Sequence, residues 1–530
     1  MIRLDRLSAS VHGLPILREV TLDIAPGAVT GLVGESGSGK SMTALAMMGL
    51  MPQGFTTSGH AWLDERDLLT LPEREMCRLR GNRIGMIFQE PMTALNPVRP
   101  IGDQVAETLV IHGKASRNEA MEVARARLAR VGLPEDRFPL TRFPHELSGG
   151  QRQRVCIAMA VALHPALLIA DEPTTALDVT TQAQILDLLK GLVEEEGMSL
   201  LLITHDLAVV AGMADHVAVM QAGEIVEQGP TEVLFRTMAH PYTRKLFAAS
   251  SHQPARMAKA GDAPLLSVEG AVRDYPTARK GVFGRPGSFR AVDDVSFTLR
   301  RGESLGLVGE SGCGKSTLTR AILGLDALQG GAIRLDGQEI HAGPRLDAAI
   351  RRRMQVVFQD PYGSFNPRWR VGRLVAEPFH LMDSRPGDMG ARVASALADV
   401  GLPPDAAERY IHEFSGGQRQ RIAIARALIT NPELIILDEA VSALDVSIRA
   451  QILDLLAKLQ REHGLAYLFI SHDLSVVRAI TDRVMVMQAG RIVEAGETGR
   501  VFTDPQHDYT RTLIAATPAI PAGWPGDSHD

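Results

Sequence analysis

Cysteine is scarce in this sequence, which places only Cys77, Cys156 and Cys313 among its 530 residues. The three are widely separated, and none has the paired spacing or the histidine neighbours that disulfide frameworks and metal sites use. Cysteine chemistry is therefore excluded as an organising feature, and this usage favours a reducing compartment.

Long apolar runs and an excess of positive charge are missing as well. A membrane-spanning helix needs about 18 consecutive apolar residues, and no such run occurs. The first residues, MIRLDRLSASVHGLP, lack the charged cap and apolar stretch of a secretory signal. The formal net charge of -6 offers no basic field that would hold nucleic acid. We therefore expect a chain that neither spans a membrane by itself nor binds nucleic acid.

An internal repeat organises the chain, whose composition of 45% hydrophobic and 22% charged residues is that of a globular protein. GLVGESGSGKS returns as GLVGESGCGKS about 270 residues downstream, and LSGGQRQR returns as FSGGQRQR. The tail HPYTRKLFAAS from His240 is echoed around His507. The segment between the copies is polar and rich in small residues, which is typical of a linker. We predict a first domain over 1–250, a linker over 251–264 and a second domain over 265–530.

Each copy alternates short apolar runs with amphipathic stretches. Runs such as AVTGLVG, ALLIAD and SLLLIT read as strands, and TQAQILDLLKGLVEE has the spacing of a helix. Strands that alternate with helices predict an α/β fold with a mainly parallel sheet covered by helices.

Each copy also holds a glycine-rich segment between a strand and a helix, the context that a phosphate-binding P-loop requires. Its backbone N–H groups can surround phosphate oxygens, and the helix N-terminus adds its positive dipole end. Lys40 and Lys315 would neutralise phosphate charge, while Ser41 and Ser316 offer hydroxyls to Mg²⁺. An unliganded glycine turn is the alternative for one copy, and the repetition argues against it. The predicted nucleotide-binding residues are Gly34, Glu35, Ser36, Gly37, Ser38, Gly39, Lys40, Ser41 and Met42, with Gly309, Glu310, Ser311, Gly312, Cys313, Gly314, Lys315, Ser316 and Thr317.

Adjacent acids end an apolar strand in each copy, as Asp171-Glu172 and Asp438-Glu439. Two carboxylates at the end of a buried strand repel each other and lose solvation, unless a cation or a reacting water uses them. We assign Asp171 and Asp438 to Mg²⁺, and Glu172 and Glu439 to polarising an attacking water. From the pairs alone, a solvated turn with acids at its tip stays open as the alternative.

The segments LSGGQRQR and FSGGQRQR, which shortly precede the acidic strands, resemble the signature motif of ABC ATPases. The resemblance covers nearly the whole chain and implies ATP and Mg²⁺ as ligands, together with a helical subdomain that carries the signature motif. It also implies a Q-loop glutamine, a D-loop and a switch histidine in each half. A structural histidine is the better reading of one copy alone, and the repetition reverses it. The implied residues are Gln89, 175–178 and His205 in the first half, and Gln359, 442–445 and His472 in the second, with both glutamines also counted as Mg²⁺ ligands.

In ABC proteins the signature motif of one domain grips the γ-phosphate of the nucleotide held by the other. The resemblance therefore pairs Lys40 with Ser415, and Lys315 with Ser148, so that two ATP molecules join the halves. Small, donor-rich turns that open a helix suit this role. The implied residues are Ser148, Gly149, Gly150 and Gln151 in the first half, and Ser415, Gly416, Gly417 and Gln418 in the second.

Two positions predict differences between the sites. Tyr275 matches the aromatic on which the family stacks adenine, whereas the corresponding place in the first half holds Val11 and His12. We expect weaker base recognition there, with His12 as a partial substitute. Cys313, near a helix N-terminus, is predicted to have a lowered thiol pKa and high reactivity, and a small residue tolerated in a turn is the alternative.

Phrases such as FQEPMTALNPV, DEPTTALDVTTQAQILDLL and the HPYT tails resemble the oligopeptide, dipeptide and nickel importer ATPases. This resemblance implies two permease subunits, an extracytoplasmic solute-binding protein, and a peripheral place on the cytoplasmic face of the bacterial inner membrane. The segments after each Q-loop, near 95–97 and 365–367, would receive the permeases. The cysteine-rich segment that many members carry after the tail is absent from both copies, so no iron-sulfur site is expected.

Three alternatives belong to other classes. A tandem ABC ATPase acting on ribosomes would show a long charged linker and no HPYT tails. An exporter ATPase would normally be joined to membrane spans. A nucleotide sensor without turnover would have lost a catalytic glutamate or histidine. Peptide is the expected cargo, and nickel, glutathione or a microcin-like compound are the alternatives, because an ATPase subunit does not touch the cargo.

Overall fold

The structure is a computed structural model that describes residues 2–175, 177–255, 261–279, 286–343, 347–360, 363–382, 386–442, 444–521 and 523–524. In the first half the strands are β1 Ile2–Val11, β2 Leu14–Ile24, β3 Val29–Val33, β4 Phe55–Leu63, β5 Arg66–Asp67, β6 Ile84–Ile87, β7 Leu167–Asp171, β8 Ser199–Thr204, β9 His216–Gln221 and β10 Glu224–Pro230. Its helices are α1 Lys40–Met47, α2 Glu73–Leu79, α3 Pro91–Ala94, α4 Ile101–Ile111, α5 Arg117–Arg130, α6 Gly149–Ala160, α7 Val179–Glu196, α8 Leu207–Met213, α9 Thr231–Thr237 and α10 Pro241–Ser250.

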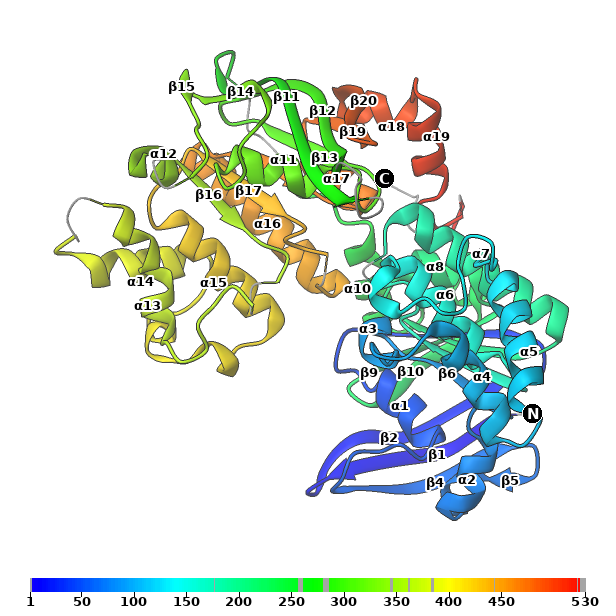
Figure 1. The fold of residues 1–530 in the computed structure, drawn as a ribbon. Coiled ribbons are helices and arrows are strands. Elements are labelled where there is room, and N and C mark those ends of the chain that lie inside the picture. Colours follow the sequence, from blue (N-terminus) through cyan, green and yellow to red (C-terminus); the bar gives the residue numbers. More distant parts are fainter. Residues whose placement is uncertain are drawn as a thin grey trace.

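The second half repeats this order (Figure 1). Its strands are β11 Pro264–Arg279, β12 Pro286–Arg300, β13 Ser304–Val308, β14 Gly330–Leu335, β15 Gln338–Glu339, β16 Met354–Val357, β17 Leu434–Asp438, β18 Ala466–Ile470, β19 Arg483–Gln488 and β20 Arg491–Glu497. Its helices are α11 Lys315–Ile322, α12 Ala348–Arg353, α13 Val371–Val375, α14 Met389–Asp399, α15 Gly416–Leu428, α16 Val446–His463, α17 Leu474–Ile480, α18 Thr498–Thr503 and α19 Asp508–Ala515.

A six-stranded, mostly parallel sheet forms the centre of each half, in the orders β10-β9-β3-β8-β7-β6 and β16-β17-β18-β13-β19-β20. Only β10 and β20 run antiparallel to their neighbours. The central strands β3, β8, β13 and β18 are buried throughout, as expected for parallel strands covered on both faces. The α/β fold with mainly parallel sheets is confirmed.

Each half also carries a four-stranded antiparallel sheet, in the orders β2-β1-β4-β5 and β12-β11-β14-β15. These antiparallel sheets were not expected from the sequence patterns. One face of each sheet packs on the central sheet, where Leu4 and Leu7 in the first half are fully buried in a shared apolar core. The P-loop helices α1 and α11 contribute to the same two cores.

Helices α4, α5 and α6 in the first half, and α13, α14 and α15 in the second, form the expected helical subdomains (Figure 1). Apolar side chains of these helices, such as Val105, Leu128 and Ile157, are buried together in one core. Both signature motifs therefore lie on a helical unit beside the central sheet.

The parallel strands bring the motifs to one edge. In the first half, β3 leads into the P-loop, β7 ends at Asp171 and β8 ends one residue before His205. The register places Val33 opposite Thr204, and Asp171 opposite Ile203. The carboxyl ends of parallel strands are the usual place for a ligand in such sheets.

The two halves also touch through their C-terminal helices. Helix α10 packs against α16, and α19 packs against α7. The rings of Phe235 and Trp524 lie 5.6 Å apart, so the segment at Trp524 contacts the first half. Helix α10 ends at Ser250 and β11 begins at Pro264; the predicted domain boundaries stay a prediction, and residues 256–260 of the predicted linker lie outside the described residues.

Among the residues that the structure describes, no helix has both the length and the apolar character needed to cross a membrane.

Candidate functional site

Both P-loops hold a buried lysine at the start of a helix. Lys40 Nζ donates to the carbonyl oxygens of Gly34 and Glu35 at 2.7 and 2.9 Å. Lys315 Nζ makes the same two contacts, at 2.7 and 2.8 Å, with the matching carbonyls of its own loop. Burial lowers the pKa of Lys40, while nearby carboxylates raise it. Each ammonium group therefore lies within its own P-loop and links two of the loop's carbonyl groups.

The P-loop backbone requires glycine at two places. Gly39, before α1, has a φ of 110°, and Gly314, before α11, has a φ of 115°. A Cβ atom on Gly34 would lie 2.2 Å from the carbonyl oxygen of Met220, and φ there is 159°. Side chains at these positions would strain or fill the loop.

These loops fit a triphosphate. Neither α1 nor α11 has a side-chain cap, which leaves the N–H groups of the first turn for a ligand. The buried hydroxyl of Ser38 is without a hydrogen-bond partner among the described residues. Buried polar atoms are nearly always paired, so this one marks a place where a polar ligand fits.

The strand-end aspartates fit a hard cation. The hydroxyl of Ser41 donates to Asp171 Oδ1 at 3.1 Å. Burial raises the pKa of Asp171, and the neighbouring Glu172 raises it further. Burial and Glu439 raise the pKa of Asp438 in the same way. A raised pKa means that the surroundings stabilise the carboxylate charge poorly, which a bound cation would correct. Hydroxyl and carboxylate oxygens such as those of Ser41 and Asp171 are suitable ligands for Mg²⁺.

The glutamates that follow have a strained backbone in both halves. Glu172 has a φ of 47° and Glu439 a φ of 50°, in the left-handed region that non-glycine residues rarely adopt. Their N–H groups donate to the carbonyl oxygens of Ile203 and Ile470, both at 2.9 Å, which holds this conformation. Strain at matching positions is typical of functional sites.

Glu172 lies among three polar partners. Gln89 Nε2 and Thr175 Oγ1 donate to its Oε2 at 2.9 and 2.8 Å, and His205 Nδ1 lies 3.2 Å from Oε1. Burial raises the pKa of Glu172, but His205, Thr175 and the charge of Lys40 lower it to about 2. The amide of Gln89 is thus engaged with this carboxylate, and its predicted role as a Mg²⁺ ligand stays a prediction.

The switch histidines contact the glutamates in both halves. His472 Nδ1 lies 3.2 Å from Glu439 Oε1, the same separation as in the first half. Burial lowers the pKa of His205, yet the hydrogen bond and charge of Glu172 raise it above its ordinary value overall. Gln359 is exposed at the end of β16.

The signature serines are used as helix caps. Ser148 Oγ accepts the N–H of Gln151 at 3.3 Å, and the Ser148 N–H donates to Gln151 Oε1 at 2.9 Å. Ser415 and Gln418 repeat this box at 3.5 and 3.0 Å. Both serines are exposed, so the caps hold the start of α6 and α15 at the surface.

The second signature glycines have a packing role that sequence reasoning missed. A Cβ atom on Gly150 would lie 2.3 Å from Thr181 Cγ2, and one on Gly417 would lie 2.5 Å from Ile448 Cγ2. By contrast, a Cβ on Gly149 would meet Leu177 at an ordinary 3.8 Å. The signature helix therefore packs directly on the start of the helix that follows the D-loop.

Each P-loop is contacted by the D-loop region of the other half. The Ser36 N–H donates to Asp445 Oδ1 at 2.5 Å. In the reverse direction, Thr180 Oγ1 donates to Glu310 Oε1 at 2.7 Å, and the backbone of Ser311 lies near enough to Asp178 to help lower the pKa of that carboxyl group. The predicted pairing of signature serines with P-loop lysines stays a prediction. Ala176 and Ala443 of the D-loops lie outside the described residues.

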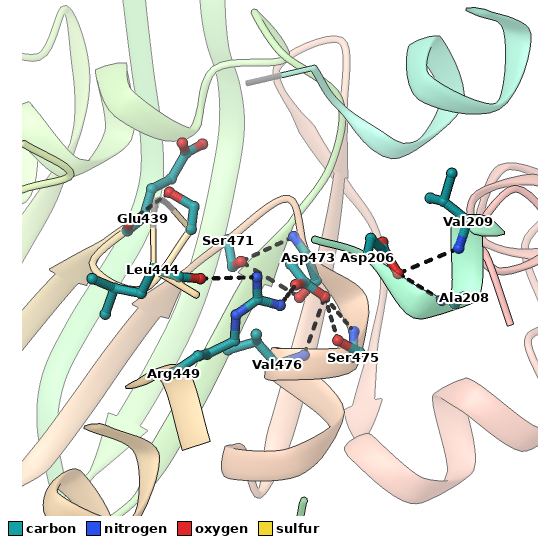
Figure 2. Close-up of polar contacts among 11 residues, drawn as sticks. Asp206, Ala208, Val209, Glu439, Leu444, Arg449, Ser471, Asp473, Ser475 and Val476 are labelled. Atoms are coloured by element: carbon teal, nitrogen blue, oxygen red, sulfur yellow. Dashed lines mark hydrogen bonds and ion pairs between the residues drawn. The ribbon is translucent and has the colours of Figure 1, made fainter. Parts of the chain in front are cut away.

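A charged cluster lies between the two switch regions (Figure 2). Asp206 and Asp473 follow the two histidines and cap α8 and α17, and they lie near each other across the halves with each carboxylate turned to its own helix. Arg449 Nη1 contacts Asp473 Oδ2 at 2.6 Å. Burial raises the pKa of Asp206, and the charge of Asp473 raises it further. Burial also raises the pKa of Asp473, but Arg449 and local hydrogen bonds lower it below its ordinary value overall. The corresponding residue of the first half is Gln182, so comparing the repeats could have revealed this asymmetry.

Tyr275 is partly buried beside the second P-loop helix. Its hydroxyl donates to Asp326 Oδ2 at 2.9 Å, and the guanidinium of Arg273 lies 4.7 Å from the ring centroid. His12 is exposed in the first half. Stacking of adenine on Tyr275 stays a prediction, as do the contributions of Met42 and Thr317.

The prediction of a lowered thiol pKa for Cys313 is wrong. Its side chain is buried, with its Sγ 3.9 Å from Lys315 Nζ. Burial raises the pKa of this thiol more than Lys315 and the loop N–H groups lower it. The small, buried residue tolerated in a turn is the reading that the structure supports.

Comparisons with known proteins decide the family. The profile of the ABC transporter family matches residues 17–175 and 292–442, and that of the oligopeptide/dipeptide transporter C-terminal region matches residues 226–267 and 493–529. This chain belongs to the ABC transporter family. Both halves therefore belong to an ATP-binding, ATP-hydrolysing enzyme, as the motifs predicted.

Curated relatives match this ABC protein over most of its length. The glutathione import ATP-binding protein GsiA of Escherichia coli (strain K12) is 50% identical in an alignment 538 residues long, which covers 95% of this chain and 86% of the relative. That of Shigella dysenteriae serotype 1 is 50% identical in an alignment 541 residues long, with the same coverage.

A solved structure of the archaeal ribosome recycling factor aABCE1, in complex with the ribosomal stalk protein aP1, matches with a TM-score of 0.61. It is 22% identical and covers 91% of this chain and 88% of its own. At that identity the likeness shows the fold alone.

Proposed function

We propose that this ABC ATPase binds and hydrolyses ATP at two sites built from both halves, and that it drives the import of a short peptide through a membrane permease. One observation carries this proposal. A buried P-loop lysine, a strand-end aspartate and a glutamate in contact with a histidine recur, with nearly equal distances, in both halves.

The P-loops would bind the phosphates of ATP. Their uncapped N–H groups and the dipole of the following helix favour phosphate oxygens, while Lys40 and Lys315 neutralise charge. When bound, Mg²⁺ would be held by Ser41 and Asp171, or by Ser316 and Asp438, and would neutralise charge on the phosphates.

Glu172 and Glu439 would polarise the water that attacks the γ-phosphate. In the resting arrangement Glu172 is ionised but held by His205, Gln89 and Thr175, and a carboxylate with a pKa near 2 is a weak base. We therefore infer that these contacts loosen when the site closes on ATP. The left-handed backbone aims the side chain from the strand end in both halves.

The reaction centres would be completed across the halves. The contacts between Ser36 and Asp445, and between Glu310 and Thr180, join each P-loop to the opposite D-loop region. ATP would then bring Ser415 toward Lys40, and Ser148 toward Lys315. The division into domains at 250 and 265 belongs to the same proposal.

The importer role is supported by the relatives. They are named glutathione import ATP-binding proteins, and they are 50% identical to this chain over 95% of its length. By this likeness the chain would act with two permease subunits and a solute-binding protein, at the cytoplasmic face of the bacterial inner membrane. Partly exposed Phe88 and Phe358, next to the Q-loop glutamines, suit contact with the permeases.

For the cargo we propose a short peptide, with glutathione as the first candidate, because glutathione is itself a tripeptide. No residue of the ATPase would touch it. The ribosome-associated alternative has only the fold likeness of the archaeal recycling factor in its favour.

Reconstitution in liposomes tests this proposal. The chain, its two permeases and a solute-binding protein are combined, and ATP hydrolysis is measured with glutathione, with a dipeptide or with a nickel chelate. We expect stimulation by glutathione or the dipeptide, and none in a Glu172→Gln, Glu439→Gln double variant. Stimulation by ribosomes, with no response to any solute, would contradict the importer role.

A further inference from the structure

The C-terminal helix of each half reaches its own P-loop. Tyr242, in α10, accepts the N–H of Glu35 with its hydroxyl at 3.2 Å. Tyr509, in α19, accepts the N–H of Glu310 at 3.0 Å. The two contacts join residues that are 207 and 199 positions apart in the sequence. Because the same contact occurs in both halves, it is not an accident of one loop's conformation.

Both tyrosine side chains are held firmly. Tyr242 is 6% exposed and Tyr509 is 8% exposed. Burial raises the pKa of Tyr242 to about 12, and burial also raises that of Tyr509, so both hydroxyls are protonated at neutral pH. A neutral hydroxyl can accept a backbone N–H while offering its own proton elsewhere.

The residues before each tyrosine fix the helix that carries it. His240 Nδ1 accepts the N–H of Tyr242 at 3.2 Å and thereby caps α10, with Pro241 in the first turn. Glu227, on β10, accepts the N–H groups of Ala239 and His240 at 2.8 and 3.1 Å. The entry to α10 is thus tied to the edge of the central sheet.

The second half repeats these anchors. His507 Nδ1 accepts the N–H of Tyr509 at 3.2 Å, and Glu494, on β20, accepts the N–H groups of Gln506 and His507 at 2.8 and 3.0 Å. The matched C-terminal family region includes Glu227, His240 and Tyr242 in the first half and their three counterparts in the second. The repeated tail sequence therefore places a tyrosine hydroxyl against the P-loop in each half.

Two consecutive N–H groups of the P-loop are held from outside the loop. The tail tyrosine holds the N–H of Glu35, and Asp445 of the other half holds that of Ser36. In the second half Tyr509 holds the N–H of Glu310, and the backbone of Ser311 lies near Asp178. In the first half the P-loop is therefore fixed at Glu35 by its own tail and at Ser36 by the opposite half.

We propose that Tyr242 and Tyr509 are positioning residues for ATP binding, each fixing the first turn of its own P-loop through the hydroxyl that accepts the N–H of Glu35 or Glu310. This inference rests on the proposed role of the P-loops. Without the hydroxyl, the loop would sample more conformations before ATP binds, and the ATP affinity would fall.

The test is the Tyr242→Phe, Tyr509→Phe double variant of the full chain. Phenylalanine keeps the ring and removes only the hydroxyl. Tyr467→Phe is the matched control, because Tyr467 is fully buried on β18 and its hydroxyl donates to the Leu456 carbonyl at 3.0 Å. It pairs with Ser304 at the amino end of β13, away from the P-loop edge.

We expect the KM for MgATP to rise about 2- to 10-fold in the double variant, because this is the loss of affinity expected when one hydrogen bond is removed. The kcat should change less than twofold. Hydrogen-deuterium exchange of the peptides that contain Glu35 and Glu310 should become faster. In Tyr467→Phe, neither the KM nor this exchange should change. A lower melting temperature with unchanged KM would overturn the inference, as would unchanged exchange at both loops.

A Lys40→Ala, Lys315→Ala variant separates a failure of the tyrosine positioning role from a failure of the proposed P-loop site. If it loses binding of MgATP, the P-loop site stands, and an unchanged KM in the tyrosine variant then overturns the positioning role alone. If it retains binding, the proposed site and the inference both fail.

Discussion

Glu172→Gln removes the charge of the first site's glutamate while it keeps the shape of the side chain. Burial alone would raise the pKa of this carboxyl group, but His205, Thr175 and Lys40 lower it from 4.5 to about 2. At about 1.4 kcal/mol for each pKa unit, the folded protein favours the ionised form by roughly 3 kcal/mol. The glutamine cannot receive this stabilisation.

The contributions of Glu172 and His205 to the stability of the fold depend on pH in opposite directions. The folded-state pKa of Glu172 is lowered, so its contribution to stability is present above pH 4.5 and is lost as the pH falls through about 2. The folded-state pKa of His205 is raised, so its contribution is present below pH 6.5 and is lost as the pH rises through the folded-state value. An ion pair therefore exists at mildly acidic pH.

The assay is an NMR titration of the full chain with ¹³C-labelled histidine, in which His205→Gln identifies the signal. In the parent chain the pKa of His205 should lie above 6.5. In Glu172→Gln the pKa of His205 should fall, because burial still lowers it and the carboxylate that raised it is gone. Glu439→Gln is the matched control and should leave this signal unmoved. An unchanged His205 pKa in Glu172→Gln would refute the reasoning.

Turnover should change in the same variant. Removing a general base costs about 10²- to 10⁴-fold in rate, so hydrolysis at the first site should nearly stop. ATP binding should be retained, because the P-loop is untouched. Equilibrium binding and single-turnover hydrolysis of ATP separate the two effects. Hydrolysis at the parental rate would show that another group acts as the base.

Two further predictions concern packing and thiol chemistry. Gly150→Ala should destabilise the chain by about 1–3 kcal/mol, because its Cβ would lie 2.3 Å from Thr181, whereas Gly149→Ala should be tolerated; equal melting temperatures would contradict this. Cys313 should react with maleimide much more slowly than the exposed Cys77, since burial raises its pKa, and equal labelling rates at neutral pH would count against the buried thiol.

Local sequence was sufficient to predict the parts of the site that one strand and its following turn determine. The P-loop, the strand that ends at Asp171 and the strand before His205 each carry their own pattern of apolar residues and special turns. Because the carboxyl ends of parallel strands lie at one edge, the place of each group at the end of its strand was enough to bring these groups to the same edge. The contact of His205 with Glu172 follows from this arrangement.

Contacts between distant segments could not be predicted in the same way. The antiparallel sheets depend on long-range pairing that short apolar runs do not specify. The contact of Ser36 with Asp445 joins residues 409 positions apart, and that of Tyr242 with Glu35 joins residues 207 apart. The pKa of Cys313 was predicted with the wrong sign because the helix N-terminus is visible in the sequence, whereas burial is not.

The central claim is that each ATP site is completed by the opposite half, and cross-linking tests it most directly. In a chain with its native cysteines replaced and with Glu172→Gln and Glu439→Gln, cysteines are placed at Ser36 and Ser415, both of which are exposed. A short thiol cross-linker should join them when MgATP is present and should join them far less without it. No cross-link in any nucleotide state would contradict the account.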